Sequence, residues 1–317
     1  ARQTCGHCAI CAITRGGWPR RLGLIHAGTA MPISFPASSN GSASNSEGPT
    51  PQGPARIEAR VPASRALRSI GALMLREMST TYGRSAGGYL WAVLEPAGTI
   101  LFMTFVISTG LRVSSPALGE SFTLFYASGM FPFMLYLRVS AKVGNAIPFS
   151  RALLSYPGVA WIDAVLARFA LSVITLMVTF LMVISVVIYG FGLDVTYNFG
   201  AILTSCGMTL VLSLGVGTLM AFLFPTYPAI ASLWSILTAP LLLISGVIFI
   251  FDDMPAIARD YLWYNPLVHV IGEMRSGFYP EYRADYVSPI YVYLIGLVSF
   301  TVGLILLKNN YRKTYQS

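Results

Sequence analysis

The chain has 317 residues, of which 55% are hydrophobic and only 11% are charged, and its formal net charge is +8. So few charges cannot cover the surface of a soluble protein of this size, which excludes an ordinary soluble enzyme. Apolar runs recur from residue 90 onward, so we expect an all-α membrane protein with a polar tail before it. Residues 1–90 hold ten arginines and three glutamates. This basic flank predicts an amino end on the cytoplasmic side of a membrane and not a nucleic-acid surface.

Residues 1–62 are predicted to be a disordered or non-native amino-terminal tail. Met31 opens a stretch rich in Ser, Pro, Gly and Asn, and the residues before it contain no apolar core of a signal peptide. Cys5, Cys8 and Cys11 surround His7 at spacings that a metal site can use. A metal site also needs a folded frame that orients its ligands, which this segment is not expected to supply. We therefore expect no metal.

Residues 63–89 are predicted to form an amphipathic helix that lies in the membrane interface. Within residues 64–82, an apolar stripe lies opposite a basic face; the two comprise Leu67, Ile70, Gly71, Met74 and Met78 against Arg65, Arg68, Arg76 and Ser79. Such a helix is too polar to span and leads into the first span as an elbow. A core helix of a soluble protein is the alternative.

Six apolar segments follow, each near the ~20 residues that cross about 30 Å of hydrocarbon. We place them at residues 91–111, 121–140, 165–189, 199–224, 229–250 and 288–307. The second is the weakest, because Gly129, Pro132 and Arg138 interrupt it. Basic residues in the loop 141–164 and after residue 307 put both ends of the chain in the cytoplasm. Residues 90–309 are thus the predicted six-helix transmembrane domain, and residues 310–317 a cytoplasmic tail.

The fourth predicted span carries a small residue at every fourth position. These are Ser205, Thr209, Ser213, Gly217 and Ala221. In lipid, apolar contact alone gives helices no preference for one another, so close approach along such a strip is a main source of packing energy. We favour helix packing for this stripe, with a lining of the transport path as the alternative.

Motifs for catalysis and nucleotide binding are absent. None of the three lysines follows a glycine, so no Walker A motif can hold ATP, and HExxH and GxSxG do not occur. The cores of five predicted spans carry no ionisable residue, whereas an ion-coupled carrier needs such groups near the bilayer centre. Glu95 is the nearest exception. We expect it to pair at the interface with a basic neighbour such as Arg84 or Arg168.

Three stretches carry a resemblance to a known family: residues 73–96 (LMLREMSTTYGRSAGGYLWAVLEP), 126–136 (YASGMFPFMLY) and 264–282 (YNPLVHVIGEMRSGFYPEY). They resemble permeases of type-two ATP-binding-cassette exporters, in particular those for capsule and O-antigen polysaccharide. The likeness extends over residues 64–317 and departs from the family at Ala86 and Gly87, where a basic and a bulky residue are frequent. The matching interfacial residues are Arg76, Glu77, Tyr82, Arg84, Tyr89, Trp91 and Glu95.

The resemblance implies a homodimer bound to two copies of a separate nucleotide-binding ATPase, which carries the ATP and Mg²⁺. By position, the loop 141–164 contains the coupling helix that docks on this ATPase. A short amphipathic piece between Pro148 and Pro157 fits that role, because both prolines end helices. Its candidate residues are Arg151, Leu153, Leu154 and Tyr156. An ordinary basic loop is the alternative.

The stretch 252–287 corresponds by position to two short external gate helices that fold back toward the membrane in this family. Its aromatic side chains suit a sugar polymer, because aromatic faces pack against the C–H faces of sugar rings. Trp and Tyr also gather at membrane interfaces in general. The candidate path residues are Tyr261, Trp263, Tyr264 and Tyr279.

The sequence therefore predicts a non-enzymatic subunit without catalytic residues or cofactors of its own. It resembles subunits that export capsular or related lipid-linked polysaccharide across the bacterial inner membrane, in contact with membrane lipid. An efflux permease for drugs or other small lipophilic molecules, from the same superfamily, is the first alternative. A membrane-embedded glycosyl- or acyltransferase is the second, and it would need an acid at a membrane face such as Asp163.

Overall fold

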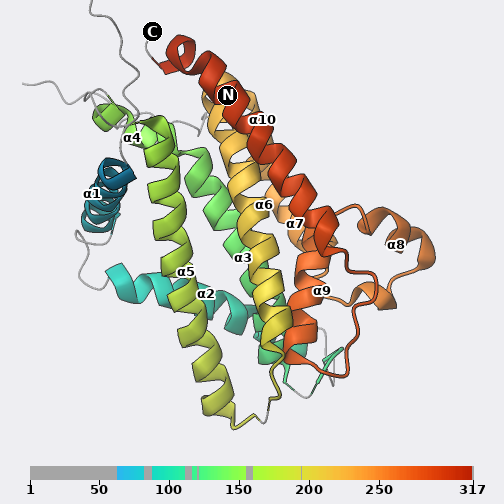
Figure 1. The fold of residues 1–317 in the computed structure, drawn as a ribbon. Coiled ribbons are helices and arrows are strands. Elements are labelled where there is room, and N and C mark those ends of the chain that lie inside the picture. The colour runs from blue at the N-terminus through green and yellow to red at the C-terminus, as the bar shows by residue number, and fades with distance from the viewer. Residues whose placement is uncertain are drawn as a thin grey trace, which may run out of the picture. The chain divides into compact units, whose positions relative to one another are not determined.

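The structure is a computed structural model that describes residues 63–81, 88–110, 116–119, 121–154, 160–193 and 195–315. These residues are mostly helical and include no β-strand, as the sequence predicts (Figure 1). The helices are α1 (Ala63–Thr81), α2 (Gly88–Phe105), α3 (Phe122–Gly144), α4 (Ala146–Leu154), α5 (Trp161–Phe191), α6 (Phe199–Thr226), α7 (Pro228–Ile244), α8 (Ala256–Leu262), α9 (Pro266–Phe278) and α10 (Pro289–Tyr315). A π-helical turn, η1 (Val106–Gly110), continues α2, and a 3₁₀ turn, η2 (Phe251–Asp253), precedes α8. The cysteine run near the amino end lies outside the described residues.

Four helices within the described ranges are long and apolar enough to cross a membrane. They are Phe122–Gly144, Trp161–Gly190, Phe199–Thr226 and Pro289–Asn310. These helices correspond to the second, third, fourth and sixth predicted spans, and α3, α5, α6 and α10 run in similar directions (Figure 1). The second, which the sequence marks as the weakest, is the most buried of the four: 78% of its 18-residue apolar window is buried. The described part of the chain therefore contains four candidate membrane spans.

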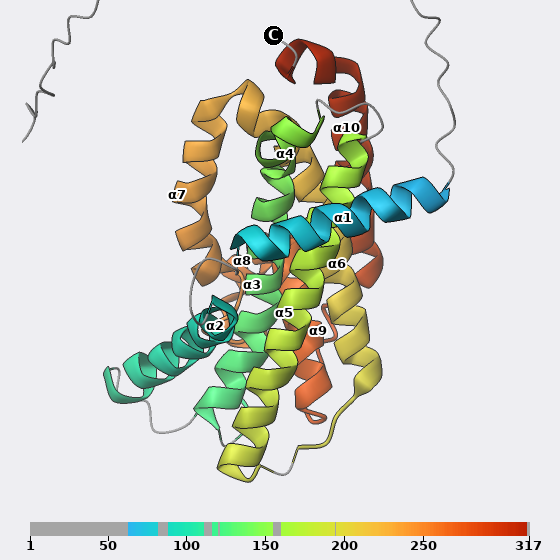
Figure 2. The same ribbon diagram turned by 90° about the vertical axis from the view of Figure 1, so that its left-hand side faces the viewer.

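The first and fifth predicted spans are shorter than expected. Their apolar helices cover Leu94–Ser108 and Pro228–Ile244, less than the ~20 residues of a full crossing. The fifth ends at Ile244 instead of residue 250, because Gly246 adopts a left-handed backbone with φ of 76° that stops the helix. The first, α2, contacts α3 and α5 but runs across them (Figures 1 and 2). The count of six spans therefore stays a prediction.

The central helix of the bundle is α6, which packs against α3, α9 and α10. All five small residues of its stripe are buried: Ser205, Thr209, Ser213, Gly217 and Ala221. A methyl group added at Gly217 would lie 2.7 Å from the Cβ of Val143 on α3. A second close approach, which sequence reasoning missed, lies on another side of α6, where Gly215 meets the backbone of Gly296 on α10. Small residues on two sides therefore let α6 approach two neighbours closely.

Helices α1, α8 and α9 complete the described fold. Helix α1 packs on α5 and crosses it (Figure 2). Helix α9 begins at Pro266, where the side chain of Asn265 accepts a hydrogen bond from the Leu267 N–H at 3.1 Å. It packs against α3, α6 and α10, whereas α8 contacts other helices little (Figure 1). Two short helices thus occupy the predicted gate stretch, and their return toward the membrane stays a prediction.

Candidate functional site

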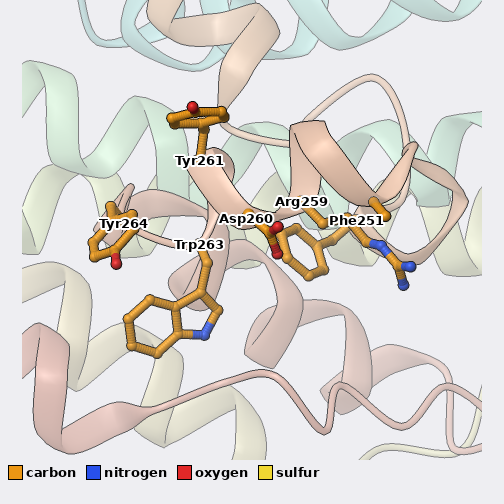
Figure 3. A pocket seen from close by; sticks show the side chains of 7 residues that line it. Phe251, Arg259, Asp260, Tyr261, Trp263 and Tyr264 are labelled. Carbon is orange, nitrogen blue, oxygen red and sulfur yellow. The ribbon is translucent and has the colours of Figure 1, made fainter.

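An open hollow lies beside α8 (Figure 3). We call it the α8 hollow; it has a volume of about 660 Å³ and is lined by Phe251, Ala256, Arg259, Asp260, Tyr261, Trp263 and Tyr264. Three of the four predicted path residues line it, whereas Tyr279 does not. The ring of Tyr279 lies instead against Gly119, in the segment between α2 and α3. The structure therefore brings together the three candidates near α8 and separates the fourth.

The floor of the α8 hollow is held by the indole of Trp263. Its ring stacks on Tyr291 with centroids 5.1 Å apart, and its Nε1–H donates to the carbonyl of Tyr286 at 3.2 Å. The hydroxyl of Tyr291 donates in turn to the carbonyl of Tyr264 at 2.8 Å. These contacts tie the end of α8 to the start of α10, so the indole has a fixed orientation.

His269 on α9 connects the residue after α8 to the segment before α10 through two hydrogen bonds. Its Nδ1 accepts from the backbone N–H of Ser288 at 3.2 Å, so in the neutral ring the proton is on Nε2. Nε2 lies 2.8 Å from the carbonyl of Trp263 and donates to it. Burial lowers the pKa of His269, which favours this neutral form. Sequence reasoning missed this residue, because a single histidine in the stretch 252–287 carries no pattern.

The rim of the α8 hollow is aromatic and exposed. Tyr261 and Tyr264 have 78% and 68% of their surface exposed. Figure 3 shows Tyr261 above Trp263 and Tyr264 to its left, with Asp260, Phe251 and Arg259 to its right. No cluster of His, Cys, Asp or Glu in the described part of the chain could hold a metal ion. The arrangement offers aromatic faces and exposed donors and acceptors, which suits binding of a polar ligand with apolar faces.

Arg275 on α9 is almost fully buried, with 2% of its surface exposed. Its two terminal nitrogens donate to the carbonyls of Val247, at 2.7 Å, and Phe249, at 2.9 Å. The guanidinium also lies 4.1 Å from the centre of the Phe125 ring on α3. Burial lowers its pKa to about 10, so it stays protonated at neutral pH. Arg275 therefore anchors the segment that leads to Phe251 in the hollow.

A pattern in the sequence indicates this anchor. Arg275 lies within the stretch 264–282, on one face of a predicted helix. Its position, four residues after Ile271 and eight after Leu267, places it on the apolar stripe of a helix. A lone arginine on such a stripe indicates a buried cation with acceptors around it.

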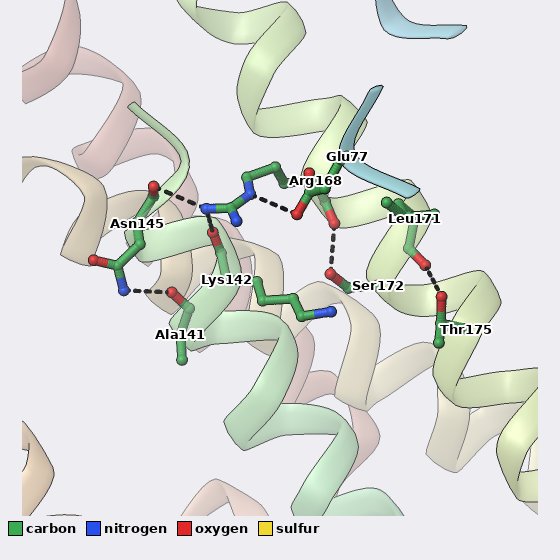
Figure 4. A network of polar contacts seen from close by, with 8 residues as sticks. All are labelled: Glu77, Ala141, Lys142, Asn145, Arg168, Leu171, Ser172 and Thr175. Carbon is green, nitrogen blue, oxygen red and sulfur yellow. Dashed lines mark hydrogen bonds and ion pairs between the residues drawn. The ribbon is translucent and has the colours of Figure 1, made fainter. Parts of the chain in front are cut away.

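A second buried arginine lies where α1, α4 and α5 meet (Figure 4). Nε of Arg168 on α5 donates to Oε1 of Glu77 on α1 at 3.0 Å. One terminal nitrogen of Arg168 also donates to the carbonyls of Lys142, at 3.3 Å, and Asn145, at 2.9 Å. The guanidinium lies 4.0 Å from the centre of the Phe149 ring on α4. We call these five residues the Arg168 junction.

Glu95 does pair with a basic neighbour, but this neighbour is not Arg168. Glu95 on α2 pairs with Arg138 on α3, with 2.8 Å between Oε1 and a terminal nitrogen of the arginine. Arg168 instead forms an ion pair with Glu77, whose carboxylate lies on the buried side of α1. The other suggested partner, Arg84, lies outside the described residues. The charge of Arg138, which interrupts the second predicted span, is thus neutralised by Glu95 on the neighbouring helix α2.

The predicted coupling segment is helical but begins earlier than expected. Helix α4 covers Ala146–Leu154, so Pro148 lies in its first turn and does not end it. Proline is tolerated there because the N–H groups of the first turn have no partner within the helix. Arg151 is exposed and Leu154 is half-buried, whereas Tyr156 lies outside the described residues and nothing is described of the Leu153 side chain.

The remaining interfacial candidates are only partly described. Arg76 on α1 and Trp91 on α2 are exposed. Tyr82 lies outside the described residues, and the side chain of Tyr89 is not described. Asp163, the acid that an enzyme would need, is buried, and its Oδ2 accepts from the N–H of Ala160 at 3.2 Å. This contact gives Asp163 a role at the start of α5.

Comparison with known families decides the assignment. The family model described as ABC-2 type transporter matches residues 68–279, from α1 to the end of α9. The chain belongs to the ABC-2 type transporter family. This match confirms the family indicated by the three sequence stretches, and it includes both the α8 hollow and the Arg168 junction.

Relatives of this ABC-2 protein carry names that refer to export. The polysialic acid transport protein KpsM of Escherichia coli is 30% identical over 239 residues, which cover 75% of this chain and 92% of KpsM. The capsule polysaccharide export inner-membrane protein CtrC of Neisseria meningitidis is 26% identical, over 75% of this chain and 89% of CtrC. The corresponding protein BexB of Haemophilus influenzae is 23% identical, over 76% and 91%. The ABC-2 chain is thus a transport subunit and not an enzyme.

Proposed function

We propose that this chain is the permease subunit of an ATP-driven exporter that moves capsular or related lipid-linked polysaccharide across the bacterial inner membrane. Membership in the ABC-2 family and the names of three relatives support the proposal. The match covers about nine-tenths of each relative, so it is not confined to one shared segment. ATP and Mg²⁺ are held by a separate ATPase subunit, because the chain has no Walker A motif.

The observation that carries the proposal is the absence of ionisable groups from two of the long helices, α6 and the part of α5 after Arg168. Helix α6 contains no Asp, Glu, Lys, Arg or His, and neither does α5 after Arg168. Proton and sodium carriers place such groups near the bilayer centre, since these groups bind and release the driving ion. The energy for transport therefore enters from a partner, with α4 and Arg151 docking on the ATPase at the cytoplasmic face. Both ends of the chain lie on that side.

The cargo passes between two copies of the chain and contacts the α8 hollow. Tyr261 and Tyr264 offer exposed rings, and Trp263 supplies a third ring that its neighbours hold in place. Aromatic rings pack on the C–H faces of sugars without a charge that would hold a polymer tightly. Tyr279, away from the hollow, contributes at another point of the same path.

The test is reconstitution of the permease with its ATPase in proteoliposomes. We expect capsular glycan to raise ATP hydrolysis, and Tyr261→Ala with Tyr264→Ala to weaken this stimulation. Tyr189→Ala is the matched control, because Tyr189 is 86% exposed but lies at the end of α5, away from the hollow. Stimulation by small lipophilic drugs and not by glycan would reassign the chain to drug efflux. Equal effects of the hollow and control variants would remove the α8 hollow from the path.

A further inference from the structure

We propose that Arg168 is a positioning residue that links movement of α4 to movement of α1 during transport. The inference rests on the proposed function, because that function makes α4 the helix that docks on the ATPase. It concerns the Arg168 junction, where the buried guanidinium lies between helices that the chain places far apart in sequence (Figure 4).

The guanidinium contacts three structural elements at the same time. Its Nε donates to Glu77 on α1 at 3.0 Å. One terminal nitrogen donates to the carbonyl of Asn145, the residue between α3 and α4, at 2.9 Å. Its face lies 4.0 Å from the centre of the Phe149 ring on α4. Any displacement of the turn before α4 therefore acts on the same planar group that holds α1.

The junction borders a small hollow of about 10 Å³ between α1, α4 and α5, which Glu77 and Arg168 line together with apolar side chains such as Leu73 and Phe149. This is close to the least space that can hold one water molecule. Helix α1 packs mainly on α5 among the described helices, so packing gives α4 little direct hold on α1. The ion pair and the ring contact therefore supply the direct connection.

The chemistry of the pair makes this connection stiff. Glu77 is 6% exposed, and separating it from Arg168 takes a charge-assisted hydrogen bond away from a buried carboxylate. Separation of α1 from α5 is thus opposed more strongly than separation of an exposed pair. The planar guanidinium also holds donors in fixed directions, so it keeps Glu77 and Asn145 in register, which a lysine ammonium cannot do.

The experiment measures ATP hydrolysed per glycan exported by the complete permease and ATPase complex in proteoliposomes. Glu77→Gln keeps the side-chain size and removes the ion pair, and Arg168→Lys keeps the charge and removes the fork. We expect both variants to insert and to hydrolyse ATP, with about fivefold more ATP spent per glycan. Glu281→Gln is the control, because Glu281 is exposed after α9 and lines neither site. Its ratio should equal that of the wild type.

A role in folding alone gives a different result. It would lower hydrolysis and export together with the amount of inserted protein, at an unchanged ratio, and this outcome would overturn the inference. The exchange Glu77→Arg with Arg168→Glu restores opposite charges, so its ratio should lie below that of either single reversal. If the wild-type complex showed no glycan-dependent hydrolysis, the proposed function and the inference would both fall. A coupled wild type with unchanged ratios in the variants would remove the inference alone.

Discussion

The two buried arginines of this ABC-2 permease are stabilised in different ways. Arg275 at the α9 end has two backbone carbonyls and a phenyl ring around it. Arg168 at the α1 end has two carbonyls, a phenyl ring and the carboxylate of Glu77. The difference between the two is the carboxylate, which adds a charge pair where a separate helix, α1, is held against α5. Backbone carbonyls compensate the arginine at the α9 end, whereas we propose that the Arg168 junction joins elements that move.

Replacing Arg275 should destabilise the protein more than replacing Arg168. Arg275→Met leaves the carbonyls of Val247 and Phe249 buried without donors, which costs about 1–3 kcal/mol for each group. We expect the largest loss of stability here, measured as a lower midpoint of thermal unfolding in detergent. Arg283→Met is the matched control, because Arg283 is an exposed arginine of the same stretch. Similar losses from both variants would contradict the role of Arg275 as an anchor.

Replacing Arg168 should lower the stability somewhat less than replacing Arg275. Arg168→Met removes the cation that donates to the buried Glu77 carboxylate, but α1 can shift and expose the acid to water. The carbonyls that Arg168 also serves belong to the half-buried Lys142 and the exposed Asn145, where water can replace the lost donor. Adding Glu77→Gln to Arg168→Met removes the carboxylate charge and should recover part of the loss. A double-mutant cycle on unfolding midpoints measures this coupling. Additive losses would show that the two side chains do not depend on each other.

His269 gives a pH test of the frame around the α8 hollow. Burial lowers its pKa below the unfolded value of about 6.5, so the unfolded state binds the proton first as the pH falls. Its contribution to stability is complete above the unfolded pKa and is lost below it, with a slope of at most about 1.4 kcal/mol per pH unit. His269→Gln should flatten this part of the stability profile, below about pH 6.5. An unchanged profile would show that another group carries the dependence.

The smallest effect is expected at the exposed pair of Glu95 and Arg138. Their side chains are 52% and 27% exposed, so water screens the attraction. Glu95→Gln should change stability by less than about 1 kcal/mol, in contrast to Glu77→Gln. Unfolding midpoints of the two glutamine variants, measured side by side, test this order. A larger loss of stability in Glu95→Gln than in Glu77→Gln would contradict the view that the Glu77–Arg168 pair is the stronger of the two.

The sequence predicts what depends on local pattern. Apolar runs gave four long helices, and the stripe from Ser205 to Ala221 gave one buried side of α6, because helical periodicity is a local property. The end of α7 was missed because one left-handed glycine, Gly246, decides it. The residues that the resemblance selected near α8 do share a hollow.

Contacts between distant residues could not be predicted in this way. Glu77 and Arg168 are 91 positions apart, and nothing in the sequence distinguishes Arg168 from Arg138 as a partner for either glutamate. The choice is made by the crossing of α1 over α5, which is a property of the packed structure (Figure 2). The same reasoning explains why Tyr279 was grouped with Tyr261, although its side chain lies against the α2–α3 segment.

The central claim is that this permease has no driving force of its own. The most direct measurement is glycan movement into proteoliposomes that contain the chain with or without its ATPase, under ATP or under an imposed proton or sodium gradient. The account predicts movement only when the ATPase and ATP are both present, and none under a gradient alone. Movement by the isolated chain under a gradient alone would contradict it.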